Sequence, residues 1–79
     1  MRAYNETKRL VLAHLERAGW QSVREIQVVM GWRSTTRAYD YLRTFRSWQL
    51  LSARTIPRLE YRLTAKGRVR LAWLTRHGM

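Results

Sequence analysis

The spacing of apolar residues along the chain predicts four helices. Apolar positions recur three and four residues apart, which is the period of an α-helix with one buried face. The predicted helices cover residues 5–18, 22–30, 34–48 and 64–76. Each begins at a residue whose side chain can cap a helix N-terminus, namely Asn5, Ser22, Ser34 and Thr64. Ser22 to Glu25 also match the capping box, in which serine and glutamate satisfy each other's backbone donors.

The period changes between the last two predicted helices. Residues 50–55 and 60–63 read as two short strands, since apolar and polar residues alternate in the second of them. Pro57 suits the turn between them because proline has no N–H to donate to a strand ladder. An isolated hairpin is barely stable, so this one is expected to lie against the helices.

The third predicted helix has two different faces. Its apolar face carries Ala38, Tyr41, Leu42, Phe45 and Trp48. The opposite face carries Thr36, Asp40, Arg43 and Ser47, flanked by Arg33, Arg37 and Tyr39. The pattern predicts a helix that packs on one side and presents Arg, Thr and Tyr on the other.

Two other helices show more apolar surface than one small core requires. In the first helix Val11 and Leu15 form a stripe with Leu10 and Leu12 on its shoulders. In the last helix Leu71 and Leu74 lie on a different side from Val69 and Trp73. The surplus favours a homodimer through Leu71, Trp73, Leu74 and helix one, and a two-fold dimer would double the contacts to two half-sites.

Length and composition limit the classes of protein. Seventy-nine residues fit a single domain, 1–79, with a thin core. There is no cysteine, and two histidines cannot make a structural zinc site, so no disulfide, metal or cofactor is expected. No apolar run approaches a membrane span of about 18 residues and no signal peptide begins the chain, so we expect a cytoplasmic protein, nucleoid-associated or in a host cytoplasm.

The charge is large and unevenly distributed. Sixteen Lys and Arg face five Asp and Glu, a net charge of +11. Residues 1–31 carry a net +2 and residues 32–79 a net +9. A compositional bias toward arginine is the alternative explanation, but it would not confine the excess to one half. The distribution favours a localised anion-binding surface of the kind found on nucleic-acid-binding proteins.

The order helix, helix, short turn, helix, hairpin, helix resembles a winged helix-turn-helix domain. The resemblance rests on residues 22–31, 34–45, Leu50-Leu51 and 61–68, and it is to small winged-helix regulators of the MarR/PadR kind. Such families often have glycine just before Leu50, where this chain has Gln49, so the exit from the third helix is expected to differ in shape. The resemblance implies that residues 34–47 form a recognition helix in the DNA major groove and residues 52–62 a wing.

Several residues of the exposed face suit DNA contact. Arg37 and Arg43 can bind guanine edges or phosphates, with Arg33 beside them. The hydroxyls of Ser34, Thr35, Thr36 and Tyr39 can reach phosphate or base edges, and Ser34 brings the free amides of a helix N-terminus toward a phosphate. Asp40 either accepts from a cytosine amine or holds a neighbouring arginine in place, and we favour the second.

Outside that helix, Arg54 and Arg58 of the wing are expected to follow the DNA backbone or enter the minor groove. Lys66, Arg68 and Arg70 either contact phosphates or face solvent. The four tryptophans are interpreted as core or subunit-interface residues rather than base-stacking platforms.

Sequence-specific binding of double-stranded DNA by a small transcriptional regulator is therefore the leading hypothesis. A DNA-architectural factor for recombination or replication is the alternative within the same class. A winged helix that binds protein or RNA is an alternative from another class, as is a cationic membrane-active peptide. An enzyme is not expected, since no Ser/His/Asp arrangement or glycine-rich phosphate loop can be assembled.

Overall fold

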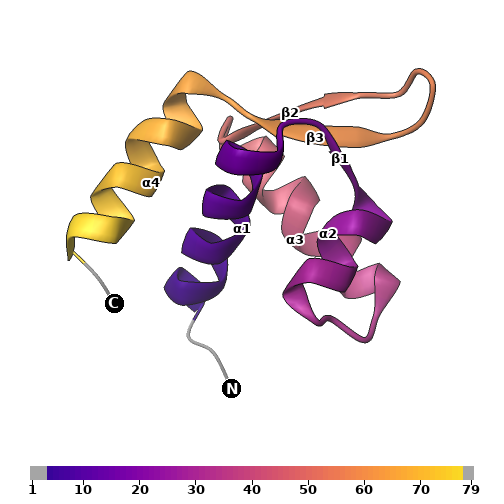
Figure 1. Cartoon of the computed structure of the whole chain (residues 1–79), viewed down its shortest axis with the longest axis horizontal. Helices are drawn as coiled ribbons and strands as arrows, with labels where there is room; N and C mark the ends of the chain where they lie inside the picture. Colours follow the sequence, from indigo (N-terminus) through magenta and orange to yellow (C-terminus); the bar gives the residue numbers. More distant parts are fainter. Residues whose placement is uncertain (1–3, 78–79) are drawn as a thin grey trace.

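The computed structural model describes residues 4–77, which form four helices and a small antiparallel sheet (Figure 1). The elements are α1 (Tyr4–Ala18), β1 (Gln21–Ser22), α2 (Val23–Met30), α3 (Thr35–Ser47), β2 (Leu51–Arg54), β3 (Glu60–Leu63) and α4 (Ala65–His77). Every predicted helix is confirmed to within one residue at each end. The prediction that Asn5 caps the first helix is wrong, because Asn5 lies within α1. The fold is mainly helical and winged helix-like, as predicted.

Short-range chemistry explains where α2 begins and ends. The Ser22 hydroxyl accepts a hydrogen bond from the Glu25 N–H at 3.1 Å, and Glu25 Oε1 accepts one from the Ser22 N–H at 2.8 Å. This is the predicted capping box. Gly31 ends the helix in the left-handed conformation, with φ of 70°, which glycine adopts without steric cost. Only a short turn then separates α2 from α3.

The sheet has three strands rather than the two predicted for the wing. Its order is β1-β3-β2, with Gln21 opposite Tyr61 in one pair and Leu51 opposite Leu63 in the other. The prediction missed β1 because two residues are too few to show an alternating pattern. The β2–β3 loop projects beyond the helices, while the other end of the sheet leads into α4 (Figure 1).

One core joins all four helices and the sheet. Its fully buried side chains include Val11, Leu12, Leu15, Ile26, Leu42 and Phe45. Figure 1 shows α1 between α4 on one side and α2 and α3 on the other, so α1 buries more than a single stripe. The prediction that Leu12 and Leu74 lie on a dimer surface is therefore wrong, because they are 0% and 5% exposed within this core.

The other residues of the predicted dimer surface remain partly accessible. Leu10 and Leu71 are half-buried and pack against the core, while Trp73 of α4 is exposed. Val69 of α4, which was not part of that predicted surface, is also exposed. No helix within the described residues is long and apolar enough to cross a membrane.

The junction between β3 and α4 packs against the exit from α3. Thr64 caps α4 by accepting a hydrogen bond from the Gly67 N–H at 2.9 Å, and its hydroxyl donates to the Gln49 carbonyl oxygen at 2.7 Å. Gln49 adopts the left-handed conformation with φ of 64°. The expectation of a differently shaped exit is therefore wrong, because Gln49 takes a conformation that favours glycine.

Candidate nucleic-acid interface

Helix α3 presents its polar face to solvent. Ala38, Leu42 and Phe45 are buried on the inner face, which anchors the helix in the core. All the site residues predicted on this segment are exposed: Arg33, Ser34, Thr35, Thr36, Arg37, Tyr39, Asp40 and Arg43. The predicted division of the helix into a packed face and an exposed polar face is confirmed for these residues. Trp48, which was predicted on the packed face, is instead 44% exposed just beyond the end of α3.

The first half of this exposed face is hollowed. A depression of about 500 Å³ is lined by Ser34, Thr36, Arg37, Asp40, Tyr41 and Thr44. Ser34, one of the lining residues, caps the helix, since its hydroxyl accepts a hydrogen bond from the Arg37 N–H at 3.1 Å. Four of the predicted residues therefore share one concavity, whereas Arg33, Thr35, Tyr39 and Arg43 lie outside its lining.

A glutamine that the sequence reasoning missed braces the turn between α2 and α3. The Gln27 side-chain amide donates to the Trp32 carbonyl oxygen at 3.2 Å, and its Oε1 accepts from the Thr35 hydroxyl at 3.0 Å. Thr35 therefore holds the start of α3 against α2. No sequence signal marks Gln27, because its polar position on an amphipathic helix looks like ordinary solvent exposure.

Trp32 stacks on Tyr41 in the same turn. Their ring centroids lie 4.9 Å apart with an interplanar angle of 19°. Both side chains are half-buried and pack against the core. This contact agrees with interpreting Trp32 as a packing residue, and it fixes the approach of the chain into α3.

The Asp40 carboxylate forms no ion pair within residues 4–77, while its carbonyl oxygen accepts a hydrogen bond from the Thr44 hydroxyl at 2.8 Å. The interpretation that Asp40 holds a neighbouring arginine in place is therefore not supported. Recognition of a cytosine amine stays a prediction.

The arginines of α3 and of the wing differ in their partners. Among the described residues, Arg33, Arg37 and Arg43 form no ion pair with a carboxylate. Arg54 and Arg58 of the wing, by contrast, are both paired. Arg33, Arg37 and Arg43 are therefore available to an external anion, whereas Arg54 and Arg58 would first have to leave their carboxylate partners.

The Glu60 carboxylate binds both Arg54 and Arg58. Arg54 donates to Glu60 Oε1 from Nε at 2.8 Å and from Nη2 at 2.6 Å, and Arg58 Nε donates to Oε2 at 3.2 Å. Arg58 also reaches Glu25 of α2 at 3.3 Å, which ties the wing to the helix-turn-helix unit. Arg54 and Arg58 are therefore ion-paired in the unbound protein, and their contact with the DNA backbone or the minor groove stays a prediction.

These contacts change the acidity of the two glutamates. The hydrogen bonds from Arg54, followed by those from Arg58, lower the pKa of Glu60 although desolvation opposes the shift. The hydrogen bonds from Ser22 lower the pKa of Glu25, and the charge of Arg58 adds to that effect. Both carboxylates are therefore held in the ionised form that binds the arginines.

Arg62 and Arg46 are two basic residues near the site that the sequence reasoning did not single out. Arg62 and Arg54 lie over the Trp20 ring, at 5.2 and 4.3 Å from its centroid. Burial raises the pKa of Tyr61, and the charges of Arg46 and Arg43 act against this rise. Both arginines are therefore near enough to Tyr61 of β3 to interact with its side chain. The outward position of Arg62 in the alternating strand was a signal that could have identified it.

Comparison with solved structures finds a DNA-binding protein with a similar fold. BpsR of Bordetella bronchiseptica, whose DNA binding is regulated by 6-hydroxynicotinic acid, superimposes with a TM-score of 0.78 at 16% sequence identity. The match covers 89% of this chain and 51% of BpsR, so the chain spans about half the length of that protein. Neither protein-family models nor curated protein sequences give a match. The likeness supports the winged helix-like fold.

Proposed function

We propose that this chain binds double-stranded DNA sequence-specifically as a small transcriptional regulator. Residues 34–47 serve as the recognition helix and residues 52–62 as the wing. The observation that carries the proposal is the exposed face of α3, where Arg37 and Arg43 stand without an acidic partner among the described residues. The structural likeness to BpsR, a protein that binds DNA, supports the same conclusion.

The proposal assigns different roles along the helix. Arg37 borders the hollow with Thr36 and Asp40, where a guanidinium can fork onto guanine O6 and N7. Arg43 lies further along the same exposed face and binds a base edge or a phosphate. An interaction surface for another protein would present apolar rather than charged residues here, so the protein-binding alternative is not favoured.

The test compares single arginine variants on a duplex selected from a random pool. Arg37→Ala and Arg43→Ala are measured by fluorescence polarisation at fixed salt, beside Arg76→Ala, which removes the same charge from the exposed end of α4. A base-reading arginine should cost about 1–3 kcal/mol on the selected duplex and relax one base position. Equal losses on every duplex would make these residues phosphate anchors, and losses no larger than those of Arg76→Ala would overturn the proposal.

A homodimer is the second part of the proposal, since two half-sites would double the contacts to DNA. Its surface is restricted to the part of α4 that remains exposed, where Val69 and Trp73 lie one helical turn apart. Light scattering with and without the duplex tests this part. A monomer in both conditions would remove the dimer and leave the DNA proposal intact.

A further inference from the structure

The end of the wing is apolar. Ile56 is 84% exposed, more than any other large apolar side chain in the described part of the chain, and Pro57 beside it is exposed as well. Both residues belong to the β2–β3 loop, which projects beyond the helices (Figure 1). Two adjoining apolar side chains are therefore presented to solvent at the projecting end of the molecule.

This loop is held in place from both sides. Arg54 before it and Arg58 after it are both bound by the Glu60 carboxylate, at 2.6 and 3.2 Å. Leu59 packs against the core, and Arg58 also reaches Glu25 of α2 at 3.3 Å. Because these contacts restrain the loop, its apolar residues are positioned before any partner binds, which lowers the entropy that binding costs.

The wing lies beside the exposed face of α3. Strand β2 packs against α3, and Arg43 of α3 is near enough to Tyr61 of β3 to interact with its side chain. A protein that places a helix in the major groove can reach the adjacent minor groove with a neighbouring segment. A duplex bound along α3 therefore brings a minor groove within reach of the wing.

Isoleucine and proline are among the apolar residues that enter a minor groove and separate stacked base pairs. We propose that Ile56, supported by Pro57, inserts between two base pairs in the minor groove and kinks the bound duplex. The inference rests on the proposed DNA binding and adds deformation of the DNA to it. Pyrimidine–purine steps unstack most easily, so such a step is expected where the wing meets the duplex.

The charges of the wing favour base insertion over contact with phosphates alone. A wing that only follows the phosphate backbone would present cations and would gain nothing from an exposed isoleucine. Here Arg54 and Arg58 are ion-paired while Ile56 is exposed. Single exposed apolar residues are common on proteins, as Val28 of α2 illustrates at 70% exposure. Ile56 differs because it lies at the end of a restrained, projecting loop.

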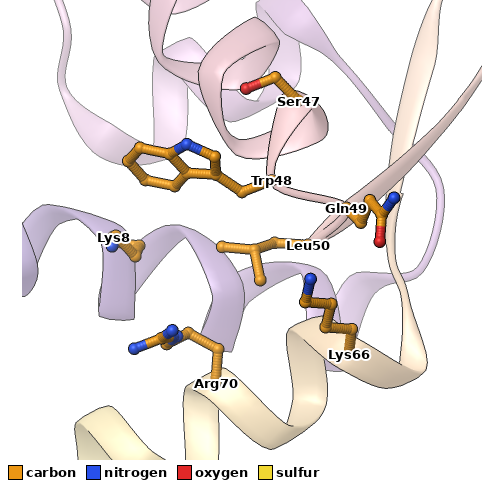
Figure 2. Close-up of a pocket in the computed structure, with 7 residues that line it drawn as sticks. All are labelled: Lys8, Ser47, Trp48, Gln49, Leu50, Lys66 and Arg70. Carbon is orange, nitrogen blue, oxygen red and sulfur yellow. The ribbon is translucent and has the colours of Figure 1, made fainter.

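A cationic surface could also bend DNA, by attracting the phosphates of one arm of the duplex. The candidate lies where α1, α4 and the exit from α3 meet, and Figure 2 shows Lys66 and Arg70 there on α4, with Leu50 between them and Trp48. Within residues 4–77, neither Lys66 nor Arg70 forms an ion pair with a carboxylate. Such a bend would be spread over many base steps, whereas an inserted side chain unstacks one step.

The experiment measures bending and unstacking of the selected duplex by the full chain at saturating protein. Energy transfer between dyes at the two duplex ends reports the bend, and 2-aminopurine placed at successive positions reports local unstacking through increased fluorescence. We expect a bend of about 20° or more and increased fluorescence at one base step only. A mismatch at that step makes unstacking easier, so it should lower the Kd by at least about fivefold.

Variants connect the unstacking to the wing. Ile56→Ala should abolish the fluorescence increase and the preference for the mismatch, whereas Ile56→Leu keeps an apolar side chain of the same size and should retain both. Val28→Ala is the matched control, because it shortens another exposed β-branched side chain, and it should change neither. The double variant Lys66→Ala with Arg70→Ala should leave the unstacked step unchanged. Circular dichroism verifies that the variants, all at exposed positions, remain folded.

The possible failures of the two proposals are distinguishable. A duplex that binds without a bend, or without a fluorescence increase at any step, would refute base insertion and leave the proposed DNA binding intact. A fluorescence increase that persists in Ile56→Ala, or that disappears in the double variant, would also refute it. Absence of binding to any duplex would remove the proposed function and this inference together.

Discussion

Arg54 donates two hydrogen bonds to one carboxylate oxygen of Glu60, its cross-strand neighbour in the wing. Arg58 binds the other oxygen of the same carboxylate. A nearly buried glutamate therefore engages two of the three arginines of the wing, and only Arg62 is not bound to it. Any phosphate contact by these arginines must compete with Glu60, which predicts how a change at this residue affects DNA binding.

Replacing Glu60 by glutamine should strengthen DNA binding. Glu60→Gln keeps the shape of the side chain but removes the charge that holds Arg54 and Arg58, so both become available to phosphates. The Kd for the selected duplex should fall, and log K should fall more steeply with log salt, by about 0.9 for each additional phosphate contact. Polarisation titrations at four or five salt concentrations measure both quantities.

Glu16→Gln is the matched control for that change. Glu16 pairs with Arg68, so the variant removes the same charge from an α1–α4 contact and not from the wing. It should alter the salt slope less than Glu60→Gln does. Identical slopes for the two variants would show that net charge alone is responsible and that the wing arginines do not reach DNA.

The same carboxylates predict how stability depends on pH. The pKa values of Glu60 and Glu25 are lowered in the folded protein, so the unfolded chain binds more protons in acid. Their contribution to the free energy of unfolding is complete above the ordinary glutamate pKa and is lost as pH falls through the lowered values. Urea unfolding at constant ionic strength should show stability decreasing from about pH 5 to about pH 3.

Glu60→Gln and Glu25→Gln should each flatten this pH dependence. Glu25→Gln retains a side-chain oxygen that can complete the capping box, so it removes the titration without removing the helix start. A wild-type slope preserved in the double variant would assign the acid sensitivity to other groups.

Local sequence signals predicted the helices well because three of the four helix starts have a capping side chain of their own. Ser22 with Glu25, Ser34 and Thr64 are caps that act within three or four residues of themselves. The polar face of α3 was also predictable from local sequence, since its polar residues recur with the helical period over consecutive turns. Contacts between distant segments had no such signature.

The wing shows what the sequence could not predict. Glu60 and Arg54 face each other only because β2 and β3 pair in one register, and Arg58 reaches Glu25 across 33 positions of the chain. Leu12 was misplaced on the surface because α1 packs against α4 as well as against α2 and the sheet, and Leu12 is fully buried in the resulting core. In each case the missing information was the three-dimensional neighbour of a residue whose own position was correctly predicted.

The left-handed conformation of Gln49 leads to a prediction of increased stability. For a residue with a Cβ this conformation costs about 1–2 kcal/mol, whereas glycine adopts it without steric cost. Glycine also makes the unfolded chain more flexible, and the entropy lost on folding offsets part of this stabilisation. Gln49→Gly should therefore stabilise the protein by up to about 1 kcal/mol. Gln49→Ala keeps the Cβ and should give no such gain in urea unfolding; equal effects of the two variants would rule out backbone strain as the cause.

Gly67 leads to the opposite prediction, although it lies in the first turns of α4. By helix propensity alone, replacing Gly67 by alanine would raise the free energy of unfolding by about 1 kcal/mol. A Cβ at Gly67 would overlap the Leu50 carbonyl oxygen and would lie 2.6 Å from Leu63 Cδ1, so α4 would have to move away from the exit of α3. Because overpacking against a backbone atom typically costs about 1–3 kcal/mol, Gly67→Ala should lower the free energy of unfolding. Urea unfolding measures the change, and a more stable variant would mean that α4 is not held against Leu50 as closely as the structure shows.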